Sequence, residues 1–223
     1  MRVALYWAPP SDDPPAGDRL WALGSAWLGR DAETGLVVAQ PDVPGLAALT
    51  ESPRRYGFHA TLKAPIALAG TFEEFLADAR ALARKLNAAT LPPLAVRKLG
   101  NFAALCPTGD VPELAALAAA VVTGLDHHRL PEAPEMAARR ARGLTPAQQA
   151  HLARWGYPYV LEEWRFHMTL SDNGAATNSL LAEAERYFAP VVGKELRVRE
   201  ICIFVEPAPG APFRLAERIA LAP

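Results

Sequence analysis

The stretch Phe58-His59-Ala60-Thr61-Leu62 is written again, with one substitution, as Phe166-His167-Met168-Thr169-Leu170, 108 positions further along the chain. Successive side chains of an extended strand point to opposite faces. In each copy the first, third and fifth residues would therefore pack into a core, while the histidine and the threonine share the other face. The β-branched threonine and the alternation favour a strand over a helix. The repeat predicts two half-buried strands, each presenting an imidazole beside a hydroxyl.

A second pattern follows each copy of the repeat. Leu-x-Val-Arg-x-(Leu/Ile)-x-x-Phe covers residues 94–102 in the first half and 196–204 in the second. One amphipathic helix is expected before each pattern, the first opened by a capping box of Thr71 and Glu74. Each half thus reads strand, helix, strand, in units of about 54–106 and 162–206.

Two such units predict an α+β fold, with residues 1–223 forming a single bilobal domain of approximate two-fold symmetry. A two-fold axis between the lobes would bring both His-x-Thr faces to one cleft. The two His-x-Thr motifs, which are far apart in the sequence, would then be close in space.

The composition sets limits on the class of protein. Of the 223 residues 51% are hydrophobic, which is ample for a core, and the formal net charge is −1. A protein that grips long nucleic acids usually shows a strong basic excess, so a small or short ligand is the better expectation. We see neither a signal peptide nor a run of membrane-spanning length, and expect a soluble, cytoplasmic protein.

No metal site is predicted. His127, His128 and His151 fall on expected helices or their ends, without partners at metal-binding spacing, and surface or capping roles are expected. The His-Thr pairs are poor zinc candidates, because threonine hydroxyls are not usual zinc ligands. Cys106 and Cys202 belong to no Cys-x-x-Cys pair, so a structural role is expected for both.

Strand alternation also assigns neighbours to the His-x-Thr faces. Lys63 would share the face of His59, and Arg165 the face of His167. Each could pair with an anionic substrate, the alternative being a solvated surface charge. Tyr56 and Tyr157 flank the two strands and could stack on a base or sugar, with packing as the alternative.

Two imidazoles that face one atom suit in-line displacement at phosphorus. Histidine accepts or donates a proton near neutrality. One neutral ring can take a proton from the attacking oxygen while a protonated ring supplies one to the departing oxygen. The threonine hydroxyls would donate to non-bridging phosphoryl oxygens. No metal or organic cofactor is needed, and the repeat leaves open which histidine is the acid.

Several stretches together resemble the DUF1045 branch of the two-histidine (2H) phosphoesterase superfamily. They are residues 4–10, 27–35, 55–65, 155–159 and 165–170. The resemblance implies a LigT-like fold, with antiparallel sheets lining a central cleft and helices outside, and a catalytic quartet of His59, Thr61, His167 and Thr169. It also implies a link to bacterial phosphonate use alongside carbon–phosphorus lyase.

The expected activity is metal-independent hydrolysis of a small cyclic phosphate or phosphodiester, in which the substrate is a sugar phosphate or a nucleotide. One alternative is RNA end processing or 2′,5′-ligation, which the arginine-rich connector (Arg139, Arg140 and Arg142) would support. Another is a non-catalytic sensor that binds a nucleotide or phosphate. A long nucleic acid and a membrane are not expected as partners, whereas a short RNA end stays open.

Overall fold

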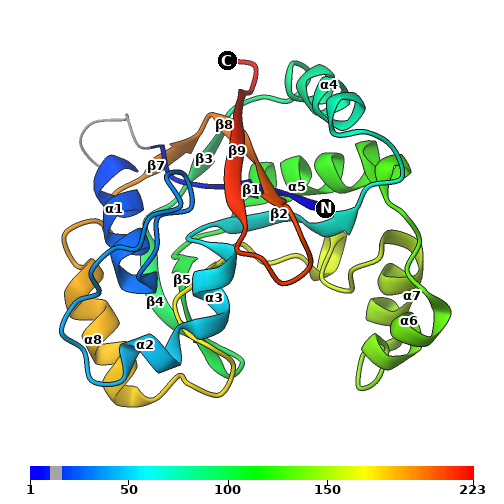
Figure 1. Ribbon diagram of the computed structural model, residues 1–223. Helices are drawn as coiled ribbons and strands as arrows, with labels where there is room; N and C mark the ends of the chain where they lie inside the picture. The colour runs from blue at the N-terminus through cyan, green and yellow to red at the C-terminus, as the bar shows by residue number, and fades with distance from the viewer. Residues whose placement is uncertain (11–16) are drawn as a thin grey trace.

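A computed structural model describes residues 1–10 and 17–223, and its centre is a seven-stranded sheet (Figure 1). The strand order is β4-β5-β6-β2-β1-β8-β9, and every neighbouring pair is antiparallel. The strands are β1 (Arg2–Trp7), β2 (Ala60–Ala67), β4 (Leu94–Leu99), β5 (Phe102–Pro107), β6 (Met168–Thr169), β8 (Glu200–Glu206) and β9 (Arg214–Ala220). A separate pair joins β3 (Ala89–Leu91) to β7 (Leu196–Val198).

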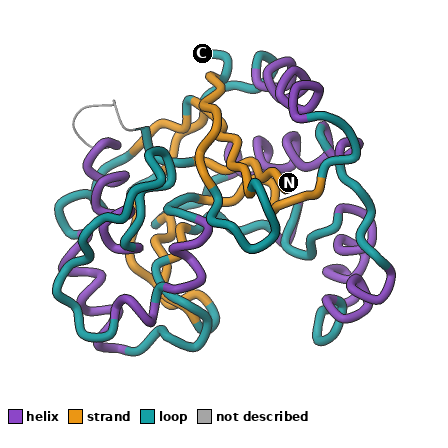
Figure 2. The backbone as a smooth tube through the Cα atoms, in the orientation of Figure 1, coloured by secondary structure: helices purple, strands orange, loops and turns teal. Residues whose placement is uncertain are grey.

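The helices lie outside the strands, as Figure 2 shows. The α-helices are α1 (Gly17–Leu28), α2 (Leu46–Leu49), α3 (Glu51–Tyr56), α4 (Phe72–Ala83), α5 (Pro112–Gly124), α6 (Pro134–Arg140), α7 (Pro146–Trp155) and α8 (Asn178–Phe188). Two short 3₁₀ helices, η1 (Asp126–His128) and η2 (Leu161–Glu163), complete the set. Helix α5 packs on β2 and α8 on β4. The α+β class, the antiparallel pairing and the outer helices were all predicted, and they are confirmed.

Two local predictions concern the helix starts and the buried faces. The capping box of Thr71 and Glu74 opens α4, with both reciprocal hydrogen bonds in place. The residues expected to face the core are buried in both copies of the repeat: Phe58, Ala60, Leu62, Phe166, Met168 and Leu170. Alternation of side chains therefore holds across each repeated stretch, although the second strand, β6, is only two residues long.

Apart from β9 at one edge, the sheet order is symmetric about the pair β6 and β2. Outward from the central pair β6 and β2 come β5 and β1, and then β4 and β8. Strand β4 follows β2 in the chain but lies beyond β6, and β8 follows β6 but lies beyond β2. The first half therefore places β4 and β5 on the β6 side of the centre, and the second half places β8 on the β2 side.

The Leu-x-Val-Arg pattern is not repeated in structure over its whole length. In the first half it forms β4, a turn and the start of β5. In the second half it spans β7 and most of β8, which are interrupted at Arg199 and belong to different sheets. Phe102 and Phe204 share one position of the sequence pattern but lie at different positions in the fold. The reason is that a turn separates the two strands in the first copy and not in the second.

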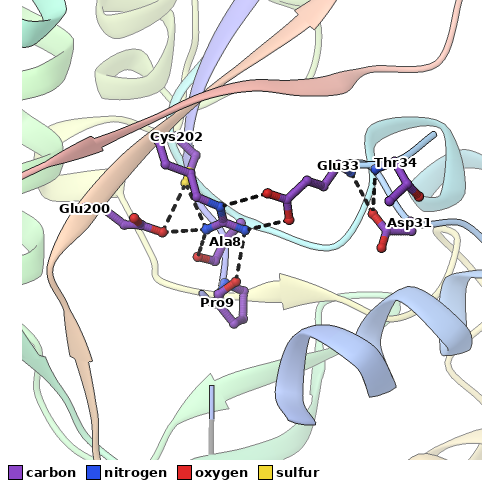
Figure 3. A network of polar contacts seen from close by, with 8 residues as sticks. Ala8, Pro9, Asp31, Glu33, Thr34, Glu200 and Cys202 are labelled. Atoms are coloured by element: carbon purple, nitrogen blue, oxygen red, sulfur yellow. Dashed lines mark hydrogen bonds and ion pairs between the residues drawn. The ribbon is translucent and has the colours of Figure 1, made fainter. Parts of the chain in front are cut away.

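A polar network fastens the outer strand β9 to the rest of the sheet. The Arg218 guanidinium donates to the carboxylates of Glu33 and Glu200 and to the carbonyls of Ala8 and Pro9. Figure 3 shows how Glu33, Glu200, Ala8 and Pro9 gather in this network from segments that are distant in sequence. One side chain therefore joins β9 to β8, to the end of β1 and to the segment after α1.

Within the described residues, no helix combines the length and the apolar character that crossing a bilayer would need.

Candidate active site

The junction between the two halves of the sheet brings both repeats together. Strands β2 and β6 pair antiparallel at Ala60 and Met168. Continuing this register places His59 opposite Thr169 and Thr61 opposite His167, so each histidine faces the threonine of the other repeat. Side chains directly opposite in an antiparallel pair lie ~5 Å apart at Cβ and share one face. All four side chains line the same cavity, of about 300 Å³.

His59 is held by a backbone carbonyl and by a ring. Its Nδ1 donates to the Gly57 carbonyl at 2.8 Å, which leaves the lone pair on Nε2, and Nε2 accepts from the Thr61 hydroxyl at 3.2 Å. The Tyr6 ring stacks on the imidazole, with centroids 3.6 Å apart and planes 16° apart. These contacts fix both the tautomer and the orientation of the ring.

Gly57 makes this anchor possible. It follows α3 with a φ of +84°, a conformation that other residues rarely adopt, and its N–H donates to the Pro53 carbonyl. A Cβ at this position would lie 2.6 Å from the Cβ of Ala32. The chain therefore needs glycine here to aim the carbonyl at His59.

His167 repeats the anchor in a more open setting. Its Nδ1 donates to the Arg165 carbonyl at 2.8 Å, two residues earlier, just as His59 uses Gly57. Its ring packs on Phe102 with centroids 5.5 Å apart and planes inclined by 52°. In both halves the anchor leaves Nε2 as the nitrogen available to the cavity.

Burial favours the neutral form of both rings. It lowers the pKa of His59 to about 4, and the nearby charge of His167 adds to the effect, against the hydrogen bond to Gly57. Burial also lowers the pKa of His167, against its bond to Arg165. The two histidines thus share an orientation but differ in surroundings.

The cavity offers hydroxyl groups where the sequence suggested cations. Among the described residues that line it there is no lysine or arginine. Tyr56 and Tyr157 line it as expected, together with Tyr6 and Ser52. A carboxylate, Asp172, also lines it and accepts from the Ser52 backbone N–H.

The expectation that Lys63 shares the face of His59 is wrong. In the pairing of β1 with β2, Tyr6 is opposite Thr61 and the next residue, Leu5, is opposite Lys63. Leu62 is therefore an extra residue, and this β-bulge turns Lys63 to the other face. Its ammonium is buried there and donates to Asp126 at 3.0 Å and to the Val122 carbonyl at 3.1 Å.

Arg165 lies beside the cavity and not in it. It is exposed and lines a neighbouring cavity of about 360 Å³ with Tyr157, Tyr159 and Trp164. The two cavities share Thr61, His167, Phe102 and Tyr157, so they meet at His167 and not at His59. A substrate that spans both would pass between the two repeats.

Tyr6 and Phe102 are cavity residues that sequence reasoning missed. Strand β1 is buried on both faces, so no alternation marks Tyr6 as different from its neighbours. Phe102 belongs to the Leu-x-Val-Arg pattern, which gave no hint that its ring would touch His167. Only the pairing of strands reveals either contact.

Three comparisons with known proteins place the chain. The profile of the family described as "Protein of unknown function (DUF1045)" matches residues 61–214. Two similar proteins are both called "Ribose 1,5-bisphosphate phosphokinase PhnN". The protein of Janthinobacterium sp. (strain Marseille) is 42% identical over 98% of this chain, and that of Laribacter hongkongensis (strain HLHK9) is 40% identical over 99%. The chain spans about half the length of these curated relatives, 50% and 52% respectively.

Among solved structures the fold is that of E. coli LigT. LigT complexed with 3′-AMP matches with a TM-score of 0.50 and 14% identity, over 100% of this chain and 99% of that one. The apo form gives the same TM-score and identity, covering 98% of LigT. The expected resemblance is thereby confirmed in family and in fold: the chain belongs to the DUF1045 family.

Proposed function

We propose that this protein is a metal-independent hydrolase of a small cyclic phosphate or phosphodiester, with His59 and His167 as its acid-base pair. The main support is the register at Ala60 and Met168, which faces each histidine with the threonine of the other repeat. A phosphoryl group between them would have a nitrogen on either side of phosphorus and hydroxyl donors at its equatorial oxygens.

The surroundings of the two rings suggest a division of roles. His59, with a pKa of about 4, is neutral near pH 7, and its Nε2 lone pair is oriented by the bond from Nδ1 to Gly57. It is suited to be the base. His167 is suited to be the acid, because a bound phosphoryl anion would raise its pKa and favour the protonated ring.

The proposed reaction balances without a cofactor. Nε2 of His59 takes a proton from water as its oxygen bonds to phosphorus. The opposite phosphorus–oxygen bond breaks, and His167 gives its proton to the departing oxygen. With substrate bound, the Thr61 hydroxyl turns from Nε2 of His59 to a non-bridging oxygen, which frees that lone pair for water. Thr169 donates to the other non-bridging oxygen, and the histidines exchange protons with solvent before the next cycle.

The charges around the cavity favour a diester over a monoester. A phosphodiester carries a single negative charge, whereas a phosphomonoester approaches two at pH 7. No described lining residue is a lysine or arginine, and Asp172 adds a negative charge to the lining. A dianion would therefore be held less well than the diester.

For the substrate we propose a five-carbon sugar that carries a cyclic phosphate, in the context of phosphonate metabolism. The cavity volume is at the lower end of the ~300–1,000 Å³ that small-molecule sites occupy. The two relatives bear a name that refers to ribose 1,5-bisphosphate. Because this chain matches only half of each, the phosphokinase activity in that name is not assigned to it.

The decisive experiment is a hydrolysis assay, followed by phosphorus NMR, on ribose cyclic phosphates, nucleoside 2′,3′-cyclic phosphates and short RNA with a cyclic phosphate end. We expect turnover of a sugar cyclic phosphate that is unchanged by EDTA. Complete loss in EDTA, restored by a divalent ion, would contradict the mechanism. Tight binding without any product would instead indicate a sensor.

RNA end processing is the enzymatic alternative that the same assay addresses. The arginine-rich connector lines neither cavity, and Arg140 pairs with Glu132 at 3.0 Å. Preference for the RNA substrate, with binding that weakens steeply as salt rises, would favour this alternative through counterion release.

A further inference from the structure

Three side chains of metal-binding type meet on the surface, outside both cavities. Asp78 lies on α4, and His127 and His128 lie on η1. The Nε2 atoms of the two histidines are 3.1 Å and 3.0 Å from the same oxygen, Oδ2 of Asp78. All three ligand atoms lie within 4.8 Å of one another.

From this geometry we propose that Asp78, His127 and His128 form a zinc site that links α4 to η1. Two imidazoles and one carboxylate are ligands that Zn²⁺ prefers. Tetrahedral bonds of 2.0–2.1 Å would separate the ligand atoms by about 3.3 Å. Each nitrogen would have to move away from the Asp78 oxygen by only about 0.3 Å to reach this separation.

The buried side of the cluster holds one ligand in place, and the exposed side lets an ion enter from solvent. His128 is buried, and its ring meets the edge of Phe75 at an interplanar angle of 84°, which limits its rotation. The side chains of Asp78 and His127 are 52% and 60% exposed. The fourth position of a tetrahedral ion would therefore face solvent and hold water.

The hydrogen bonds within the cluster already orient one carboxylate oxygen of Asp78 toward both imidazoles. The ion would replace the two hydrogen bonds by stronger contacts and hold together segments that are 50 residues apart. Zinc bound to the folded state alone would raise stability by mass action.

The zinc site is separate from the proposed catalytic site and has a structural role. None of its residues lines the cavity at His59 and His167. Asp126, the first residue of η1, accepts hydrogen bonds from Lys63 of β2 and from Arg129. Bound zinc would thus stabilise the packing of α4 against η1 near β2. EDTA is therefore expected to lower the stability of the protein and to leave its hydrolytic activity unchanged.

The test is a zinc titration of metal-stripped full chain without a polyhistidine tag, in competition with a chromogenic chelator. We expect one equivalent of Zn²⁺ to bind. Changing a ligand's supporting partner alone typically costs 10- to 100-fold in affinity, so Asp78→Asn and His127→Gln should each weaken binding by at least ~10-fold. Both side chains are half exposed or more, and both variants should fold.

His151→Gln is the matched control, because His151 also donates to a carboxylate, Glu162 at 2.8 Å, but forms no three-ligand group with any other described residue. It should bind zinc as tightly as the parent chain. A second readout is thermal unfolding, in which zinc at about 100 times its Kd should raise Tm by several degrees. Asp78→Asn should abolish this rise.

Three results would overturn the site. They are the absence of zinc binding, equal affinity in Asp78→Asn and the parent chain, and loss of binding in His167→Gln with retention in Asp78→Asn. The last result would place the ion in the cavity between the repeats.

Discussion

The two His-x-Thr repeats orient their imidazoles in the same way but surround them differently. Each ring donates from Nδ1 to the carbonyl two residues earlier at 2.8 Å. His59 then lies under the stacked ring of Tyr6 and accepts from Thr61, whereas His167 has a tilted contact with Phe102. The backbone of a repeat thus sets where a ring points, and the neighbouring strand sets how readily it is protonated.

The largest expected effect comes from removing either imidazole. His59→Ala and His167→Ala should each lower kcat for cyclic phosphate hydrolysis by about 10²- to 10⁴-fold, since each would remove a proton-transfer step. His151→Ala, outside the cavity and paired with Glu162, should retain full activity. Steady-state kinetics on the three variants test whether the two repeats contribute comparably, and equal rates in all three would disprove the assignment.

Replacing the threonines should cost less and should show whether the hydroxyls are equivalent. Thr61→Val and Thr169→Val keep the shape of the side chain and remove one donor to the phosphoryl oxygens, which is worth up to about 10²- to 10³-fold in kcat. Thr61 also bonds to His59, while the Thr169 hydroxyl has no hydrogen-bond partner among the described residues. Valine variants with unchanged kcat would show that the hydroxyls do not act on the transition state.

The anchor at Gly57 can be broken without touching an imidazole. Gly57→Ala brings a Cβ within 2.6 Å of Ala32, and we expect a loss of about 1–3 kcal/mol in the free energy of unfolding from overpacking. The matched control is Gly143→Ala, because Gly143 also has a positive φ, +78°, but nothing lies within 4 Å of its Cβ position. Urea unfolding of both variants compares a crowded position of positive φ with an open one, and equal losses would contradict the role of Ala32.

Replacing Tyr6 and replacing Phe102 should shift opposite limbs of the pH profile of activity. Tyr6→Leu opens the site of His59 to water, which should raise its pKa and shift the acidic limb of kcat/KM to higher pH. Phe102→Leu should raise the pKa of His167 and shift the alkaline limb upward. If both variants moved the same limb, the base and acid roles proposed here would be wrong.

The last effect is on stability in acid and does not involve the substrate. The folded pKa of His59, about 4, lies below the unfolded value of 6.5, so the unfolded chain binds the proton more readily between these values. Stability should therefore fall as pH drops from 6.5 to 4, by at most about 3 kcal/mol from this residue. His59→Gln should flatten the slope more than His167→Gln, which urea unfolding at several pH values would measure.

Local alternation made much of the site predictable from sequence. The buried and cavity-facing positions of both repeats follow from the two-residue period of a strand, and the start of α4 follows from its capping box. The prediction failed at Lys63 because a β-bulge appears only once β1 and β2 are paired. The cluster around Asp78 was hidden for a similar reason, since the packing of α4 against η1 decides which carboxylate meets His127 and His128.

The exchange of β4 and β8 across the centre makes the two halves dependent on each other during folding. A fragment that ends after β5 would keep the β4–β5 hairpin but lack β6, the strand that connects this hairpin to β2. Its open backbone edges would favour aggregation. Mixing two complementary fragments should therefore recover a soluble complex, and hydrolysis would report directly on their reassembly, because neither piece holds both histidines.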